Sequence, residues 1–471
     1  MKRLGQLLAG VVLISLMTGC TVGPNYKRPA TNTPQSYRGA VAPAIAQDTS
    51  VASLGDQKWA DVFQDPVLKK LIAEAITNNF DVRIAAQRVL EEEAQVGIVR
   101  AQQFPSINGG GSYTGFGLPS NFIGNSGLPP LAYGGGLTAS GAWNLDFWGL
   151  YRRQTQAERA ELLASEWAKR ATQTTVITNV AQSYLDLRSL DEQLEITQKT
   201  IEARQNSLKL TQALESRGAT SLADVRQAEE LLYAAKANLP NLQREIADQE
   251  NALSILLGRN PGPIERGLSV SAQPHPEEIP AGIPSQLLER RPDIQQAEAK
   301  LIAANARIGV AKAQFFPQFS LTAIGGSASN QLSTVFAGKN AYWYAAGSLS
   351  EPIFDGGRIR NNYRLSKAEE QEVLTAYQKT IAGALRDVSD ALVAYQKTHE
   401  YREQQEQQTK AATDAVRLAR LRYNGGYTSY LEVLTNDTNL YTAQLTLAQA
   451  EQEEALSLVQ VYTALGGGWQ Q

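Results

Sequence analysis

One stretch of the chain, residues 131–148, reads LAYGGGLTASGAWNLDFW and changes character at every second residue. Its odd positions are mainly apolar or aromatic, and its even positions are mainly small or polar. A period of two is that of a β-strand, whose successive side chains point to opposite faces. The stretch exceeds the roughly 9–11 residues that a tilted strand needs to cross a membrane. It therefore predicts a membrane strand with one apolar face.

Three more segments have strand character, which places strands at about 105–148 and about 317–355. Phe319, Leu321 and Ala323 alternate with polar residues, and Trp343 shares a face with Glu351 in the last segment. An open sheet edge is costly in lipid, and membrane barrels have at least about eight strands. We therefore expect four strands per chain in a barrel shared among subunits. A half-buried soluble sheet is the alternative.

The remaining sequence favours long helices. Residues 66–103 are rich in helix-forming side chains, and residues 154–217 contain neither glycine nor proline. The second of these segments corresponds to roughly 96 Å of helix at about 1.5 Å per residue. Residues 358–423 behave alike, with only Gly383 inside. Alanine, glutamine, threonine and serine dominate, so both a solvated coiled coil and a hollow helical tube remain open.

The chain is internally duplicated. The sequence AQQFP at 101–105 recurs as AQFFP at 313–317, and GATS at 218–221 recurs as GYTS at 426–429. Ordered matches at near-constant offset indicate a structural repeat. We predict a first repeat over 66–258 with a turn at 218–220, a connector over 259–283, and a second repeat over 284–468 with a turn at 424–428. Each repeat runs helix, two strands, long helix, turn and helix. The pairs Ser221/Asp224 and Ser429/Glu432 have the spacing of capping boxes.

The N-terminus has the pattern of an export signal. Lys2 and Arg3 precede an apolar run over 7–17, which ends in LMTGC at Cys20. This ending resembles a bacterial lipobox, so we expect residues 1–19 to be removed and Cys20 to become an N-palmitoyl, S-diacylglycerol cysteine. Thr21 is not the aspartate that retains lipoproteins at the inner membrane. Residues 20–65 then read as an extended tether. The alternative is an ordinary signal peptide.

Composition excludes several other classes. The net charge is −3, so phosphate-rich nucleic acid is not an expected partner. Cys20 is the only cysteine, and His275 and His399 are far apart, so we expect neither a disulfide nor a metal or cofactor site. Asp387 and Asp390 share a helix face, but a solvated or lumen-facing surface explains them better than catalysis. No enzymatic activity is expected.

Several motifs together resemble the TolC/OprM-type outer membrane factors of tripartite efflux pumps. They are TVGPNYKRP at 21–29, NLDFWG at 144–149, PAGIPS at 280–285, RRPDI at 290–294, ANARIG at 304–309 and YTALGGGW at 462–469. The resemblance covers nearly the whole chain. It implies a homotrimer whose twelve-stranded β-barrel continues into a twelve-helix periplasmic α-barrel. It also implies an equatorial belt that includes residues 259–283.

The same resemblance implies function and partners. The chain would be a passive outer-membrane duct for small toxic compounds or drugs in a Gram-negative bacterium. Its partners would be a periplasmic adaptor protein and an inner-membrane transporter of the resistance-nodulation-division class. Two alternatives remain: a type I protein-secretion duct, and a coiled-coil surface lipoprotein or adhesin without transport. The exported substrate is not encoded here.

The helical turns hold the candidate gate residues. In several relatives an aspartate follows the last Leu-Leu or Val-Leu of the second turn and rings the periplasmic aperture. In the segment YLEVLTND at 430–437, Thr435 occupies that position, and Asp437 lies about 200° farther around the helix. Asp224 corresponds to the acidic position of the first turn. It can cap its helix, act in the gate, or do both.

Overall fold

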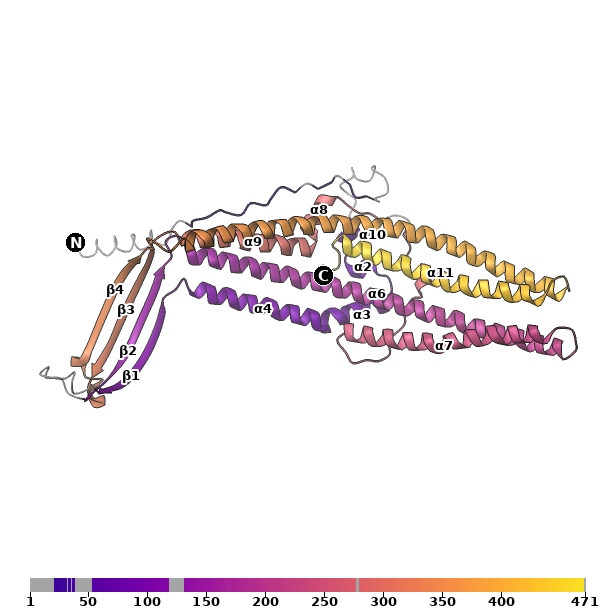
Figure 1. Ribbon diagram of the computed structural model, residues 1–471, viewed down its shortest axis with the longest axis horizontal. Helices are drawn as coiled ribbons and strands as arrows, with labels where there is room; N and C mark the ends of the chain where they lie inside the picture. The colour runs from indigo at the N-terminus through magenta and orange to yellow at the C-terminus, as the bar shows by residue number, and fades with distance from the viewer. Residues whose placement is uncertain are drawn as a thin grey trace. The chain divides into compact units, whose positions relative to one another are not determined.

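The computed structural model describes residues 21–31, 33–34, 36–38, 53–117, 131–276 and 279–469. Within these residues the chain is mainly helical and has four strands, as predicted (Figure 1). The expected signal peptide, Cys20 and most of the region expected to be a tether before residue 53 lie outside the described residues.

The helices follow the predicted duplicated order. The two longest, α6 and α10, contain 66 and 67 residues and confirm the long uninterrupted helical segments. The helices are α2 (Trp59–Val62), α3 (Pro66–Asn78), α4 (Phe80–Ala101), α6 (Leu150–Glu215), α7 (Leu222–Leu256), α8 (Pro284–Arg290), α9 (Pro292–Ala313), α10 (Arg358–Asn424) and α11 (Tyr430–Ala464).

The helix expected over 66–103 is interrupted at Asn79, which the sequence reading missed. Asn79 leaves helical geometry, its Oδ1 accepts the backbone N–H of Asp81 and Val82, and its Nδ2 donates to the carbonyl of Leu256. Asparagine competes in this way for backbone hydrogen bonds and so begins a new helix. Asn79 is therefore a local capping signal within the expected helix, and the contact with Leu256, distant in sequence, adds a second restraint that no local pattern shows.

The strands form one antiparallel sheet in the order β1-β2-β3-β4. They are β1 (Ser106–Gly117), β2 (Leu131–Leu145), β3 (Gln318–Ser329) and β4 (Ala341–Ser350). The register confirms the alternation read from the sequence. Trp143 lies opposite Leu321, and Phe319 lies opposite Leu349. Because directly paired residues share a face, the apolar odd positions of neighbouring strands line one side of the sheet.

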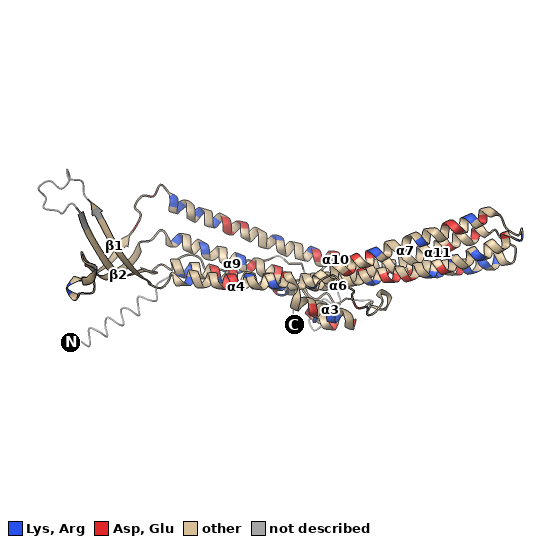
Figure 2. Cartoon of the chain, turned by 90° about the horizontal axis from the view of Figure 1, so that it is seen from below, with Lys and Arg blue, Asp and Glu red and all other residues tan. Residues whose placement is uncertain are grey.

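The strands carry no charged residue. Every lysine, arginine, aspartate and glutamate in this part of the structure lies in a helix or a connection, so the strands are tan in Figure 2. The apolar face is exposed in the single chain, with Trp343 at 83% and Ile107 at 81%. Glu351, which interrupted the predicted apolar face, follows the end of β4. Both edges of the sheet, β1 and β4, are unpaired within the described chain.

None of the described helices combines the length and the apolar character needed to cross a membrane.

The chain forms two compact units. The first contains the described residues within 1–30, 89–165 and 297–377, and therefore holds the sheet. The second contains residues 31–88, 166–296 and 378–471, and holds both helical turns. The core of the second unit includes Leu68, Ile72, Val180, Tyr184 and Leu253, all nearly inaccessible to solvent. This core holds α3, α6 and α7 together.

Candidate functional site

The first turn connects α6 to α7 and places Asp224 in a capping box. Gly218 has a φ of +72°, a conformation that favours glycine and lets the chain reverse. Asp224 receives the Ser221 N–H at 3.1 Å and the Thr220 hydroxyl at 2.6 Å, while the Ser221 Oγ accepts the Asp224 N–H. Hydrogen bonds from Thr220 and Ser221 lower the pKa of Asp224. Its carboxylate is therefore ionised and engaged in the cap.

The second turn connects α10 to α11 but does not repeat the capping box, so that prediction was wrong. Ser429 makes no side-chain cap hydrogen bond. Glu432 is instead bound by the hydroxyl of Thr428 and by Nη1 of Arg422, the latter at 2.9 Å. The arginine and the neighbouring threonine compete for the carboxylate that the capping box needs.

Thr435 and Asp437 lie on different sides of α11. Thr435 is exposed, and its hydroxyl donates to the Leu431 carbonyl one turn earlier. Asp437 is directed toward the first hairpin and retains only 15% of its side-chain exposure. The angle of about 200° between the two residues thus places Thr435 in solvent and Asp437 against the first hairpin.

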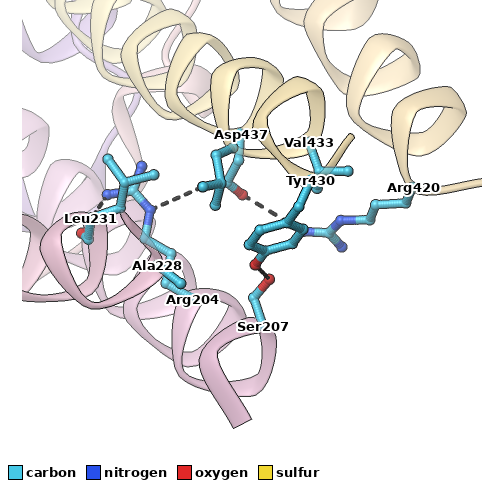
Figure 3. Close-up of a pocket in the computed structure, with 9 residues that line it drawn as sticks. Arg204, Ser207, Ala228, Leu231, Arg420, Tyr430, Val433 and Asp437 are labelled. Atoms are coloured by element: carbon cyan, nitrogen blue, oxygen red, sulfur yellow. Dashed lines mark hydrogen bonds and ion pairs between the residues drawn. The ribbon is translucent and has the colours of Figure 1, made fainter. Parts of the chain in front are cut away.

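Asp437 belongs to a small pocket lined by α6, α7, α10 and α11, with both polar and apolar side chains (Figure 3). Its Oδ2 lies 2.9 Å from Nε of Arg204, and its Oδ1 lies 3.6 Å from Nη2 of Arg420. Arg204 also donates from Nη1 to the carbonyl of Leu231 at 2.8 Å and lies over the ring of Tyr441. One buried arginine thus connects the two hairpins of the chain.

A hydroxyl pair closes the same pocket toward the turns. The Ser207 Oγ and the Tyr430 hydroxyl are 2.5 Å apart, and Tyr430 is almost fully buried. The Tyr430 ring packs on Tyr423 with centroids 5.2 Å apart. These contacts add a second connection, nearer the turns than Arg204, between α6 and α11.

A second polar cluster surrounds Glu454, and the sequence reading did not find it. Glu454 is 1% exposed and lies within ion-pair distance of Nδ1 of His275 at 3.0 Å, Nδ1 of His399 at 2.6 Å and Nε of Arg402 at 2.6 Å. Burial opposes ionisation of Glu454, but contacts with His275 and His399, and the charge of Arg402, lower its pKa to about 2. The two histidines are far apart in sequence, yet folding brings both to one carboxylate.

Glu451, one turn earlier, has the opposite shift. Burial raises its pKa to about 7, and repulsion from Glu192 acts in the same direction. Two carboxylates with opposite pKa shifts therefore lie where the connector meets α6, α10 and α11. His275 belongs to the connector predicted over 259–283, so this cluster fixes the connector to the helices.

The segment after Cys20 is held in the first unit. Arg153 donates to the carbonyls of Val22 and Gly23 and, at 2.9 Å, to Oδ1 of Asn25. Gly23 has a φ of +103°, and a Cβ there would lie 2.5 Å from Cα of Gly309, so the close approach requires glycine. The motifs at 21–29 and 304–309 are thus in direct contact. Cys20 itself lies outside the described residues, so its modification stays a prediction.

The same segment is fastened again a few residues later. Arg28 binds Glu298 through Nε at 2.7 Å and Nη2 at 2.5 Å, and the Tyr26 hydroxyl donates to the same carboxylate. Glu298 is only 7% exposed. A bidentate, half-buried pair of this kind positions the chain with specific geometry.

Charge-free strands with an exposed apolar face, joined to long polar helical hairpins, define an outer-membrane duct protein. Comparisons with known proteins agree. The family model described as outer membrane efflux protein matches residues 71–259 and 283–467. The chain belongs to this family. It is an efflux channel of the bacterial outer membrane that works in tripartite efflux systems, and it is a transport duct, not an enzyme.

Individual relatives span the full chain. The cation efflux system protein CusC of Escherichia coli is 34% identical over 470 residues, which cover 99% of each chain. The toluene efflux pump outer membrane protein TtgC of Pseudomonas putida is 35% identical, over 98% of this chain and 96% of its own. The open-state structure of the MtrE outer membrane channel of Neisseria gonorrhoeae aligns with a TM-score of 0.86 at 29% identity, covering 96% of this chain and 99% of that one.

Proposed function

We propose that three copies of the chain form the duct. The supporting observation is the sheet, whose strands have an apolar face and carry no charge, and whose two edges are unpaired. Unpaired sheet edges are not tolerated in the hydrocarbon region of a membrane, so neighbouring copies have to pair with them. Two copies would supply eight strands, but an eight-stranded barrel is filled by its own side chains. Three copies give twelve strands and an open lumen.

The duct is passive and receives small toxic compounds or drugs from an inner-membrane transporter of the resistance-nodulation-division class through a periplasmic adaptor. Relatives named for efflux of cations and of toluene support small solutes as cargo. The adaptor meets the helical turns at 218–220 and 424–428. Residues 259–283, together with the tether over 20–65, form a belt around the helical part.

Cys20 is lipidated and holds the N-terminus in the periplasmic leaflet. The fastening of residues 22–28 by Arg153 and Glu298 supports this assignment, because it fixes the chain directly after the modified cysteine. Palmitate labelling of the wild-type protein and of Cys20→Ala tests it. Label in the wild type alone is expected, and an unlabelled wild type would refute lipidation.

The gate is formed at the turns by Asp224, Thr435 and Asp437. Asp437 acts indirectly and does not line the aperture, because its ion pair with Arg204 restrains α11 against α6. Thr435 lies on the exposed surface, where threefold symmetry would bring equivalent side chains together. Asp224 contributes charge while it caps α7. Asp437 therefore sets the position of α11, and Asp224 and Thr435 define the aperture.

A matched pair of substitutions in the middle of β4 tests the duct. Ala345 pairs with Ala323 on the apolar face, whereas Ala346 pairs with Thr322 on the other face. An arginine facing the bilayer midplane costs about 2–4 kcal/mol, but an arginine facing the lumen is tolerated. In a strain lacking the chromosomal gene, Ala346→Arg is expected to assemble, whereas Ala345→Arg loses both assembly and resistance to toxic solutes. Equal behaviour of the two variants would contradict the membrane orientation.

A further inference from the structure

The start of α10 carries an unusual run of cations. Residues 358–368 contain Arg358, Arg360, Arg364 and Lys367, and no carboxylate. At about 100° per residue, Arg360, Arg364 and Lys367 fall within roughly 60° of one another around the helix. All three are exposed, while Ile359 packs inward. The side chains therefore form one basic stripe, defined here as Arg360, Arg364 and Lys367.

Nothing in the described chain neutralises this stripe. No described carboxylate is within ion-pair distance of its members, and Nζ of Lys367 lies over the ring of Tyr363, 5.6 Å from the centroid. Like charges four residues apart destabilise a helix. The first repeat differs: Arg152, which like Arg360 is the third residue of its long helix, is paired with Asp146 at 3.2 Å. The unpaired stripe is thus a feature of the second repeat alone.

The stripe begins where the membrane ends. Between β4 and α10, Ile353 and Phe354 are 100% and 90% exposed, as expected for side chains that contact lipid. Aromatic residues gather at the same end of the sheet, where the strands meet the helices: Trp148 stacks on Phe316 and Phe147 contacts Phe319. Aromatic girdles mark the interfaces of membrane barrels. From Arg360 to Lys367 the helix rises roughly 10 Å, similar to a Debye length at physiological salt.

We propose that the basic stripe binds the phosphate groups of anionic phospholipids in the periplasmic leaflet. Apolar Ile353 and Phe354 insert among acyl chains, and the three cations lie at headgroup level, where long side chains extend toward phosphate. The stripe thereby fixes the depth of the barrel and selects anionic lipid around the duct. The binding depends on salt, because the phosphates are held by charge.

The test uses quenching of tryptophan fluorescence by brominated lipids in a Trp343→Phe background, since Trp143 lies on the apolar face of β2, two residues before the end of the strand that adjoins the helices. The full-length acylated assembly is reconstituted in phosphatidylcholine vesicles containing brominated phosphatidylglycerol or brominated phosphatidylethanolamine. We expect the wild type to prefer phosphatidylglycerol at least threefold at low salt, with loss of the preference in 1 M salt. The triple variant Arg360→Gln, Arg364→Gln, Lys367→Gln is expected to show no preference.

A matched control removes three cations farther along the same helix, in Lys397→Gln, Lys410→Gln, Arg417→Gln, and should retain the wild-type preference. These three are paired with acidic residues of α10. Equal quenching by both lipids in the wild type would overturn the proposal. So would an unchanged preference in the stripe variant. A third result would also overturn the proposal: the stripe variant fails to assemble, and the wild type shows no preference for either lipid. That result would show that a neighbouring subunit covers the stripe.

Discussion

Nε of Arg204 in α6 lies 2.9 Å from Oδ2 of Asp437 in α11, although 233 residues separate them in sequence. The guanidinium is 6% exposed and the carboxylate 15%. Removing one partner of a buried ion pair leaves an uncompensated charge and typically costs about 3–5 kcal/mol. Separating the two hairpins at this level breaks the pair, so the pair opposes that movement.

Asp437→Ala is therefore expected to increase single-channel conductance in planar bilayers and to lower the melting temperature of the assembly. Asp414→Ala is the matched control, because Asp414 forms an exposed pair with Arg417 inside one helix. Such a pair contributes little to stability. If both variants conduct like the wild type, the Arg204–Asp437 pair does not restrain the channel.

Asp224→Ala tests cap and gate together. Loss of the capping box should reduce the free energy of unfolding by about 0.5–2 kcal/mol. A gate role also predicts higher conductance or antibiotic leakage with little change in the yield of assembled protein. Ser221→Ala is a useful comparison, since it removes the cap partner and keeps the acidic charge. A stability loss in both variants with unaltered conductance would reduce Asp224 to a capping residue.

Thr435→Asp introduces charge at an exposed position of α11. Three equivalent carboxylates at the aperture would attract cations and repel anions. We expect greater cation selectivity, measured as a shift in reversal potential under a salt gradient, and little change in stability. An unchanged reversal potential would place Thr435 away from the conducting path.

The Glu454 and Glu451 pair predicts opposite pH responses. The pKa of Glu454 is lowered from 4.5 to about 2, so its stabilising effect is complete above pH 4.5 and is lost as the pH falls toward 2. The pKa of Glu451 is raised from 4.5 to about 7, so the folded state loses stability as the pH rises through this interval. His275, Arg402, Glu192 and Glu406 are the ionisable groups that act on Glu451.

Melting temperatures of the two variants across pH 2–8 measure these effects. Glu454→Gln should flatten the acidic limb of the wild-type curve. Glu451→Gln should remove the decline between about pH 4.5 and 7, and raise the melting temperature near pH 7. Parallel curves for wild type and both variants would contradict the electrostatic description of this cluster.

The fold could be predicted to a large extent because its determinants are local or repeated. Alternation at 131–148 gave the strand and its apolar face, and the run without glycine or proline at 154–217 gave the long helix. The interruption at Asn79 has a local part, the cap that its side chain makes to Asp81 and Val82, and a part that the sequence does not show, a hydrogen bond to a carbonyl 177 residues away. Periodicity indicates which face of a helix or strand a side chain occupies, but it does not indicate which distant residue that side chain contacts.

The same limit applies to the site. Ser221 and Asp224 are neighbours, so the sequence spacing predicted their capping box. The rotation of Asp437 away from Thr435 also followed from helix geometry, but its partner Arg204 did not. His275, His399 and Glu454 come from three elements and have no mutual spacing to recognise. Long-range ion pairs such as these require the folded chain.

The mass of the detergent-extracted assembly tests the shared duct most directly. Open edges at β1 and β4 require neighbouring copies, and an open lumen requires more than eight strands. Native mass spectrometry of the acylated protein in mild detergent should give three times the mass of the mature chain. A folded monomer or a dimer under the same conditions, with strand content intact, would contradict the trimeric barrel.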